Sequence, residues 1–491
     1  MPGPGWGNLD FSGAIDRVVE YARRDWVLDL IGHADTIRWL REAPERLGAL
    51  LEHSYEPHRP THVPVPKTSL TVRPTLHIGL AERAVVQALV ETFAVETLRD
   101  VPEWVCGWRF NDGAELPADL AGNSLEWDRY NELLQIYHQS GPWFVLKTDI
   151  ANFFHHVPLS VLRDSLTIPS PEIQGALFKF LESWAPARVG LPQPMLASSL
   201  LANAYLRPVD AVLSSYEAVR WMDDITVFCS SRSEGIRALV RIQDALRRLN
   251  LGINAAKTSL APSDPSEFST PGFRLGASGE AIAEDPIQIS ACPPIPPWDE
   301  VIDSDEVERR VFGIYARRLP HEKPDRFARE ILQRLGRLPH VADHASQYLR
   351  AATDPPDVLR RVQDFLKGPD NQFAWQEYRL ATLYWHAEEL SHRHLAFALS
   401  RAKDGNIFKP TRGVYLRAVA RHGTSNHAMM IEEMGEHEDD PIMLRSLVLA
   451  AAESGHIPHR RVRQMARGEP SLGRLAGYLA NRQWRVPELC F

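Results

Sequence analysis

Three carboxylates in two apolar contexts constrain this chain more than any other feature. Asp149 ends a short apolar run, and Asp223 and Asp224 interrupt a second run over residues 221–228. The first run predicts a buried strand that delivers a carboxylate at its tip. The β-branched residues 225–227 follow the acidic pair, so the second run predicts a hairpin with both acids at its turn.

Grouping three acids is unfavourable because like charges repel and burial removes their hydration, and bound divalent cations are the usual remedy. Phosphoryl transfer is a reason to keep such a group, since two Mg²⁺ ions about 4 Å apart activate a hydroxyl and stabilise the leaving pyrophosphate. The sequence therefore predicts Asp149, Asp223 and Asp224 as ligands of two Mg²⁺ ions, for which Mn²⁺ can substitute. An isolated Asp-Asp pair is more often a solvated turn, so the prediction depends on the whole pattern.

Three blocks in fixed order carry a resemblance to a known family. They read FVLKTDIANFF at 144–154, GLPQPMLASSLLANAYL at 190–206 and WMDDITVF at 221–228. These blocks resemble motifs A, B and C of reverse transcriptases. The resemblance implies an α+β fold with the fingers and palm of a right-hand polymerase, and an RNA-directed DNA polymerase-like nucleotidyltransferase activity. It also implies that the Ile150 backbone carbonyl joins the metal ligands and that Gln193 positions the nucleotide.

Two further segments extend the resemblance on either side. Residues 251–258 look like motif D, in which Lys257 neutralises or protonates the departing pyrophosphate. Residues 65–74 resemble the fingers hairpin, with Lys67 and Arg73 as clamps on the nucleotide phosphates. An ordinary charged surface hairpin is the alternative for this second segment.

Phe154 matches the position of a steric gate, where an aromatic ring collides with a ribose 2′-hydroxyl and favours deoxynucleotides. Packing in the palm core is the alternative. The chain departs from the family at Pro194 and Met195, where motif B usually has glycine, and at Trp221, where motif C commonly has tyrosine or phenylalanine. Proline fixes φ and removes an amide donor, so we expect a reshaped template-facing surface.

Charge and hydropathy limit the partners. Residues 1–280 hold 26 Lys and Arg against 34 Asp and Glu, a balance of −8, and the remainder hold 29 of each. A protein that grips a long duplex by its phosphates is normally basic, so we expect few and localised nucleic-acid contacts. No apolar run approaches the roughly 18 residues of a membrane span, and the start does not resemble a signal peptide. We expect a cytoplasmic bacterial protein without a membrane partner.

The chain divides into four expected regions. We expect an N-terminal helical segment over 1–60, fingers and palm over 61–285, a Pro-rich linker over 286–300, and an all-α domain over 301–491 in place of a normal thumb. Spacings near 30 residues in the last region favour a HEAT-like helical repeat, and an irregular bundle is the alternative.

A palm followed by a helical repeat resembles the bacterial abortive-infection and unknown-group reverse transcriptases. The resemblance implies antiphage defence, addition of deoxynucleotides to a DNA product without an ordinary template, priming by a hydroxyl of the protein, and homo-oligomers formed through the helical domain. A retron-like templated enzyme that copies a dedicated non-coding RNA is the alternative, and a non-enzymatic nucleic-acid-binding scaffold is a third hypothesis. Tyr205, Tyr216, Tyr315 and several serines are all chemically suitable for priming, and the sequence does not select among them.

Overall fold

The computed structural model describes residues 6–22, 33–111, 114–141, 143–263, 298, 302, 312–313, 316, 324–351 and 355–487. The chain forms two compact units. Unit 1 comprises Met1–Asp25, Leu40–Thr61 and Leu76–Pro294, and unit 2 comprises Trp26–Trp39, His62–Thr75 and Ile295–Phe491. In the described part of the chain, no helix is long and apolar enough to cross a membrane.

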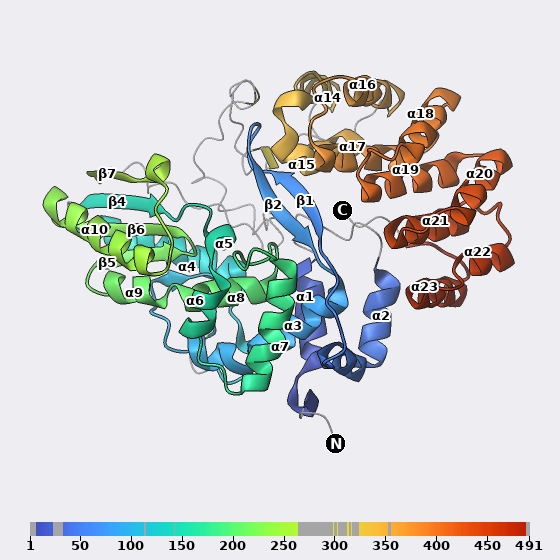
Figure 1. The fold of residues 1–491 in the computed structure, drawn as a ribbon. Coiled ribbons are helices and arrows are strands. Elements are labelled where there is room, and N and C mark those ends of the chain that lie inside the picture. The colour runs from blue at the N-terminus through green and yellow to red at the C-terminus, as the bar shows by residue number, and fades with distance from the viewer. Residues whose placement is uncertain are drawn as a thin grey trace, which may run out of the picture. The chain divides into compact units, whose positions relative to one another are not determined.

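The elements up to residue 262 are mostly those of unit 1 (Figure 1). They are α1 (Phe11–Ala22), α2 (Ala34–Glu42), β1 (Thr61–Pro66), β2 (Val72–His77), α3 (Leu80–Leu98), β3 (Val105–Cys106), α4 (Asn123–Gln139), β4 (Phe144–Asp149), α5 (Phe153–His156), α6 (Leu159–Ser165), α7 (Pro171–Trp184), α8 (Leu196–Tyr205), α9 (Arg207–Leu213), β5 (Glu217–Trp221), β6 (Asp224–Cys229), α10 (Arg232–Arg248) and β7 (Ser259–Pro262).

A five-stranded sheet organises unit 1, and we call it the palm sheet. Its strand order is β3-β5-β6-β4-β7, with β3 parallel to β5 and the other neighbours antiparallel. Leu146, Ile225 and Val227 are each at most 1% exposed. Helix α10 packs against β4, β6 and β7, and Gly235 of α10 allows the close approach, because a Cβ there would lie 2.6 Å from Leu260 Cδ1.

The described residues of the C-terminal part of unit 2 form helices joined by short loops. Its helices are α14 (Pro324–Gln333), α15 (Ala342–Arg350), α16 (Pro355–Lys367), α17 (Ala374–His386), α18 (His392–Lys403), α19 (Lys409–His422), α20 (Ser425–Glu436), α21 (Pro441–Glu453), α22 (His459–Met465) and α23 (Pro470–Asn481). The helices α15, α17, α19, α21 and α23 contact one another in that order, and α14, α16 and α18 form a second row (Figure 1). Small residues allow close contact between α19 and α21, since a Cβ on Gly413 would lie 2.4 Å from Ser446 Oγ.

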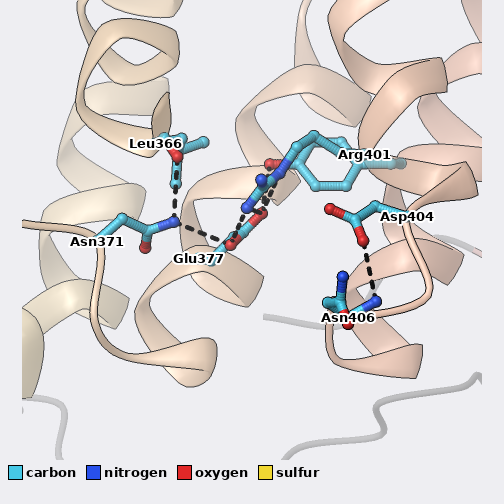
Figure 2. Close-up of polar contacts among 7 residues, drawn as sticks. Leu366, Asn371, Glu377, Arg401, Asp404 and Asn406 are labelled. Carbon is cyan, nitrogen blue, oxygen red and sulfur yellow. Dashed lines mark hydrogen bonds and ion pairs between the residues drawn. The ribbon is translucent and has the colours of Figure 1, made fainter. Parts of the chain in front are cut away.

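A buried ionic cluster joins three of these helices. Figure 2 shows the Glu377 carboxylate of α17 facing Arg401 of α18, which donates to it through Nε at 2.8 Å and Nη2 at 2.5 Å. Asn371 donates to the same carboxylate at 3.0 Å, and the Tyr415 hydroxyl of α19 lies 3.4 Å from it. Glu377 is 6% exposed, so the Arg401 charge is needed to offset its loss of hydration.

The fold confirms the expected mixture of helices and strands followed by a mostly helical region. The HEAT-like character of the helices stays a prediction, as do the four expected boundaries. Most of the expected linker over 286–300 lies outside the described residues. The hairpin segment His62–Thr75 groups with unit 2, whereas the sequence-based division assigns it to the fingers and palm. Within unit 2, Val63 and Val65 belong to the same apolar core as the helices, which accounts for this grouping.

Candidate active site

The palm sheet brings two of the predicted acids side by side. In the register of β4, β5 and β6, Asp149 pairs with Asp224, and Asp224 pairs with Trp221. Asp223 lies in the two-residue turn between β5 and β6, and its carbonyl accepts from the Ile150 amide at 3.2 Å. The three acids therefore meet at one end of the sheet, as the sequence predicts.

A buried arginine fixes the turn that carries Asp223 and Asp224. Arg220 is fully buried and donates to both carboxylate oxygens of Asp210, at 2.7 and 2.8 Å. Its Nη1 also donates to the Met222 carbonyl at 3.0 Å and to Asn203 Oδ1 at 3.1 Å. Met222 adopts a left-handed φ of 52°, which non-glycine residues rarely do. The Arg220 contacts hold the backbone in this turn.

Two residues of the segment 251–258, which resembles motif D, hold the Asp149 carboxylate. Lys257 Nζ lies 2.7 Å from Asp149 Oδ2, and Asn254 Nδ2 donates to Oδ1 at 3.1 Å. The Asn254 amide also donates to the Asp149 carbonyl at 2.6 Å. The structure thus brings Lys257 to the acids, as expected, while the Asn254 contact was not part of the sequence-based prediction.

The pKa values of two side chains in the site are raised by burial and because the acids lie close together. The surrounding protein removes part of the hydration of Asp224, and the charges of Asp223 and Asp149 add to this effect, so the pKa of Asp224 rises to about 6. Burial, followed by the Asp224 charge, raises the pKa of the nearby Tyr130 hydroxyl to about 12.

The donor chemistry of the acids fits a divalent cation. Carboxylate oxygens are the ligands that Mg²⁺ and Mn²⁺ prefer, and a cation would relieve the repulsion that raises the pKa of Asp224. In the described residues, no group of three or more His, Cys, Asp or Glu side chains is already arranged as a metal site. Lys257 Nζ contacts one oxygen of Asp149, and each carboxylate oxygen keeps a second lone pair that can bind a cation.

The other predicted site residues of unit 1 lie around the acids. Ile150 is 1% exposed and follows Asp149 directly. Phe154 is half-buried on α5, and its ring centroid lies 5.3 Å from that of the buried Phe153. The Phe154 carbonyl accepts from the Leu191 amide at 2.7 Å, and the Gln193 carbonyl accepts from Leu76 at 2.8 Å. Phe153 supplies the core packing, which leaves Phe154 as the candidate gate.

Lys67 and Arg73 lie at the tip of the two-stranded sheet formed by β1 and β2. The Lys67 amide donates to the Thr71 carbonyl at 2.8 Å and closes the hairpin turn. Lys67 is exposed and Arg73 is half-buried. Both residues belong to unit 2, so their contact with the nucleotide stays a prediction.

The comparison with protein families identifies the class. Residues 66–275 match the family described as reverse transcriptase (RNA-dependent DNA polymerase). The chain therefore contains a reverse transcriptase domain, and it is an enzyme of the RNA-directed DNA polymerase, nucleotidyltransferase type. This family normally uses divalent metals and binds nucleotides and nucleic acid. A search of curated proteins found no match to the chain.

Proposed function

We propose that this protein is a defence-associated DNA polymerase that adds deoxynucleotides by two-metal phosphoryl transfer. The observation that carries the proposal is the group formed by Asp149, Asp224 and Lys257 at the end of the palm sheet, inside a reverse transcriptase domain. Two bound Mg²⁺ ions would activate the attacking hydroxyl and stabilise the leaving pyrophosphate. The three acids would hold them, with the Ile150 carbonyl as a further ligand.

The remaining residues position the nucleotide. Lys257 is half exposed beside the acids, where its ammonium group can donate to a pyrophosphate oxygen. Phe154 excludes a ribose 2′-hydroxyl, and Gln193 lies on the segment that leads into α8. Lys67 and Arg73 supply positive charge for the triphosphate.

The defence role rests on the resemblance of the whole chain to abortive-infection reverse transcriptases. It is supported by a polymerase domain that is followed by helices α14 to α23. We propose protein-primed and untemplated DNA synthesis that stops phage growth in a bacterial cytoplasm, with homo-oligomers formed through the helical region. The match to RNA-dependent DNA polymerases favours a second candidate, a retron-like enzyme that copies a dedicated non-coding RNA.

A labelling experiment separates these functions. Purified, nuclease-treated protein is incubated with each labelled deoxynucleotide and Mg²⁺ or Mn²⁺, without template, beside the double variant Asp223→Asn/Asp224→Asn. We expect labelled DNA only with the wild type. Labelling that appears only when a co-purified RNA is spared from nuclease would replace our proposal with the retron-like function. Labelling that never appears, with or without RNA, would favour a non-enzymatic scaffold.

A further inference from the structure

One face of the palm sheet carries the acids. Asp149, Asp224 and Trp221 are paired across β4, β6 and β5, so their side chains lie on the same face. Side chains alternate along a strand, so every second residue shares this face. By the observed register these residues are Val145, Lys147, Thr226, Phe228, Val219 and Glu217.

Helix α4 packs on this same face. Leu134 of α4 forms a buried apolar cluster with Cys106, Val145, Val219 and Phe228, and three more α4 side chains pack against it: Tyr130, Leu133 and Tyr137. The spacing of Tyr130, Leu134 and Tyr137 is that of one helical face. Helix α4 therefore places its own side chains directly beside the acids.

Tyr130 of α4 lies in the same pocket as Asp149 and Asp224. It lines a pocket of about 380 Å³, and the other lining residues are Leu134, Lys147, Thr148, Asp149, Asp224, Ile225, Thr226 and Lys257. The Tyr130 ring is held by Trp127 and Trp221, with centroid distances of 5.3 and 5.8 Å. Burial and then the charge of Asp224 raise the pKa of the Tyr130 hydroxyl, while Thr226 lowers it.

Position and exposure distinguish Tyr130 from the two other hydroxyls in this pocket. Thr148 is 4% exposed and its hydroxyl is bonded to that of Thr258 at 2.8 Å, and Thr226 is 6% exposed. Tyr130 is only partly buried. Tyr130, Asp149 and Asp224 line the same pocket, and the Asp224 charge acts on the Tyr130 hydroxyl. The pocket volume of about 380 Å³ leaves room for a phosphate group between them.

The tyrosines considered from the sequence are less suitable. Tyr205 is fully buried and its hydroxyl donates to the Leu249 carbonyl at 2.6 Å. Tyr216 precedes β5 at the end of the strand opposite to Trp221, about 16 Å from the acids. Tyr315 lies outside the described residues.

We propose that the Tyr130 hydroxyl is the acceptor to which this enzyme attaches its first deoxynucleotide. The inference rests on the proposed function and names its priming group. The Tyr130 oxygen attacks the α-phosphorus of a deoxynucleoside triphosphate, and a tyrosyl phosphodiester bond forms. The bond from the α-phosphorus to the bridging oxygen breaks, and pyrophosphate leaves with Lys257 beside it. The hydroxyl proton passes to bulk solvent, to which the pocket is open.

The test uses the full-length, nuclease-treated protein, Mn²⁺ or Mg²⁺ and labelled deoxynucleotides. Peptide mass spectrometry of the labelled wild type is expected to find a deoxynucleoside monophosphate on Tyr130. Tyr130→Phe keeps the ring and removes the acceptor, so the label should fall at least about 100-fold. Tyr137→Phe on the same helix is the matched control, and its label should stay within about twofold of wild type.

A second assay separates this inference from the proposed function. Each protein is given a DNA primer annealed to an RNA template, and its melting temperature is measured. Tyr130→Phe should melt like wild type and extend the primer within about tenfold of the wild-type rate. Label mapped to another residue, or retained by Tyr130→Phe, would overturn the inference. A wild type that extends the primer but never labels itself would overturn it while the polymerase function stands, and a wild type that does neither would overturn both.

Discussion

At the scale of single residues, each acid of the site has a different environment. Asp149 is 6% exposed and is held by Asn254 and Lys257, whereas Asp224 keeps contact with solvent and has a raised pKa. Asp223 lies in the turn that immediately precedes β6. The acids are therefore not equivalent, and their variants should differ in stability as well as in activity.

The variant Asp224→Asn should stabilise the metal-free protein while abolishing nucleotide addition. The amide keeps the size of the side chain and removes a charge that Asp223 and Asp149 repel. Because Asp224 is partly solvated, we expect a gain of only about 0.5–1 kcal/mol. Thermal unfolding in EDTA measures it. Asp244→Asn, at an exposed position on α10, is the control and should show no gain. An Asp224→Asn protein that melts below wild type in EDTA would contradict this prediction.

Phe154→Val should weaken discrimination against ribonucleotides. A smaller side chain removes the ring expected to collide with the 2′-hydroxyl, and the neighbouring Phe153 preserves the core. We expect the ratio of kcat/KM for a ribonucleotide to that for a deoxynucleotide to rise about 10–100-fold. Single-nucleotide addition kinetics give this ratio. If it does not change, Phe154 is a packing residue.

At the scale of elements, the strands that deliver the acids were predictable because apolar periodicity and motif spacing coincide there. The turn at Asp223 and the strand that ends at Asp149 appear where they were expected. The sequence did not predict that α4 covers the face of the palm sheet that carries the acids. The amphipathic pattern of a helix shows which of its own faces is buried, but it does not identify the surface against which that face packs. The pairing of Arg220 with Asp210 was also missed, because ion pairs buried in the palm leave no local pattern.

Glu377→Gln should destabilise the protein through its helical region. The variant leaves the Arg401 guanidinium without its carboxylate, within a cluster that joins α17, α18 and α19. Removing one partner of a buried ion pair costs about 2–4 kcal/mol when the other partner is partly solvated. Urea unfolding measures the loss. Asp357→Asn, which breaks an exposed pair on α16, is the matched control and should cost less than about 1 kcal/mol.

The helical region should lose stability as the pH falls from 6.5 to 4. Burial, followed by the charges of Arg350, Arg421 and Arg417, lowers the pKa of His386 to about 4. In this window the unfolded chain binds a proton that the folded chain does not, so acid favours unfolding. We expect a loss of about 1–3 kcal/mol between these two pH values from His386.

The variant His386→Gln tests whether His386 causes this loss of stability, because a glutamine side chain does not bind a proton in this pH range. Stability measured by urea unfolding across the pH range should fall less steeply for the variant than for wild type. His392→Gln, at an exposed position at the start of α18, should follow the wild-type curve. Equal slopes for wild type and His386→Gln would assign the acid sensitivity to other groups.

At the scale of the whole molecule, net charge influences how strongly the protein binds nucleic acid and how that affinity depends on salt. The chain carries a formal charge of −8, which opposes non-specific binding to phosphates. We expect the affinity for a supplied primer-template to fall only slowly with salt, with a log–log slope of magnitude below about 3. Binding titrations between low and physiological salt measure this slope. A steep dependence would reveal an extended phosphate-binding surface that the charge balance does not indicate.

The pairing of the palm sheet also determines the order in which the molecule can assemble. Val105 pairs with Arg220, 115 positions later, and β4 pairs with β7 near residue 260. Contacts among α14 to α23 join helices that are close in the sequence. Because closing long loops is slow, we expect the helices to fold quickly after they emerge from the ribosome. The palm, although synthesised first, completes its sheet only after β7 has paired. A palm that has not yet paired β7 also lacks the Asn254 and Lys257 contacts that hold Asp149, so nucleotide addition should begin only after the chain has folded through residue 262.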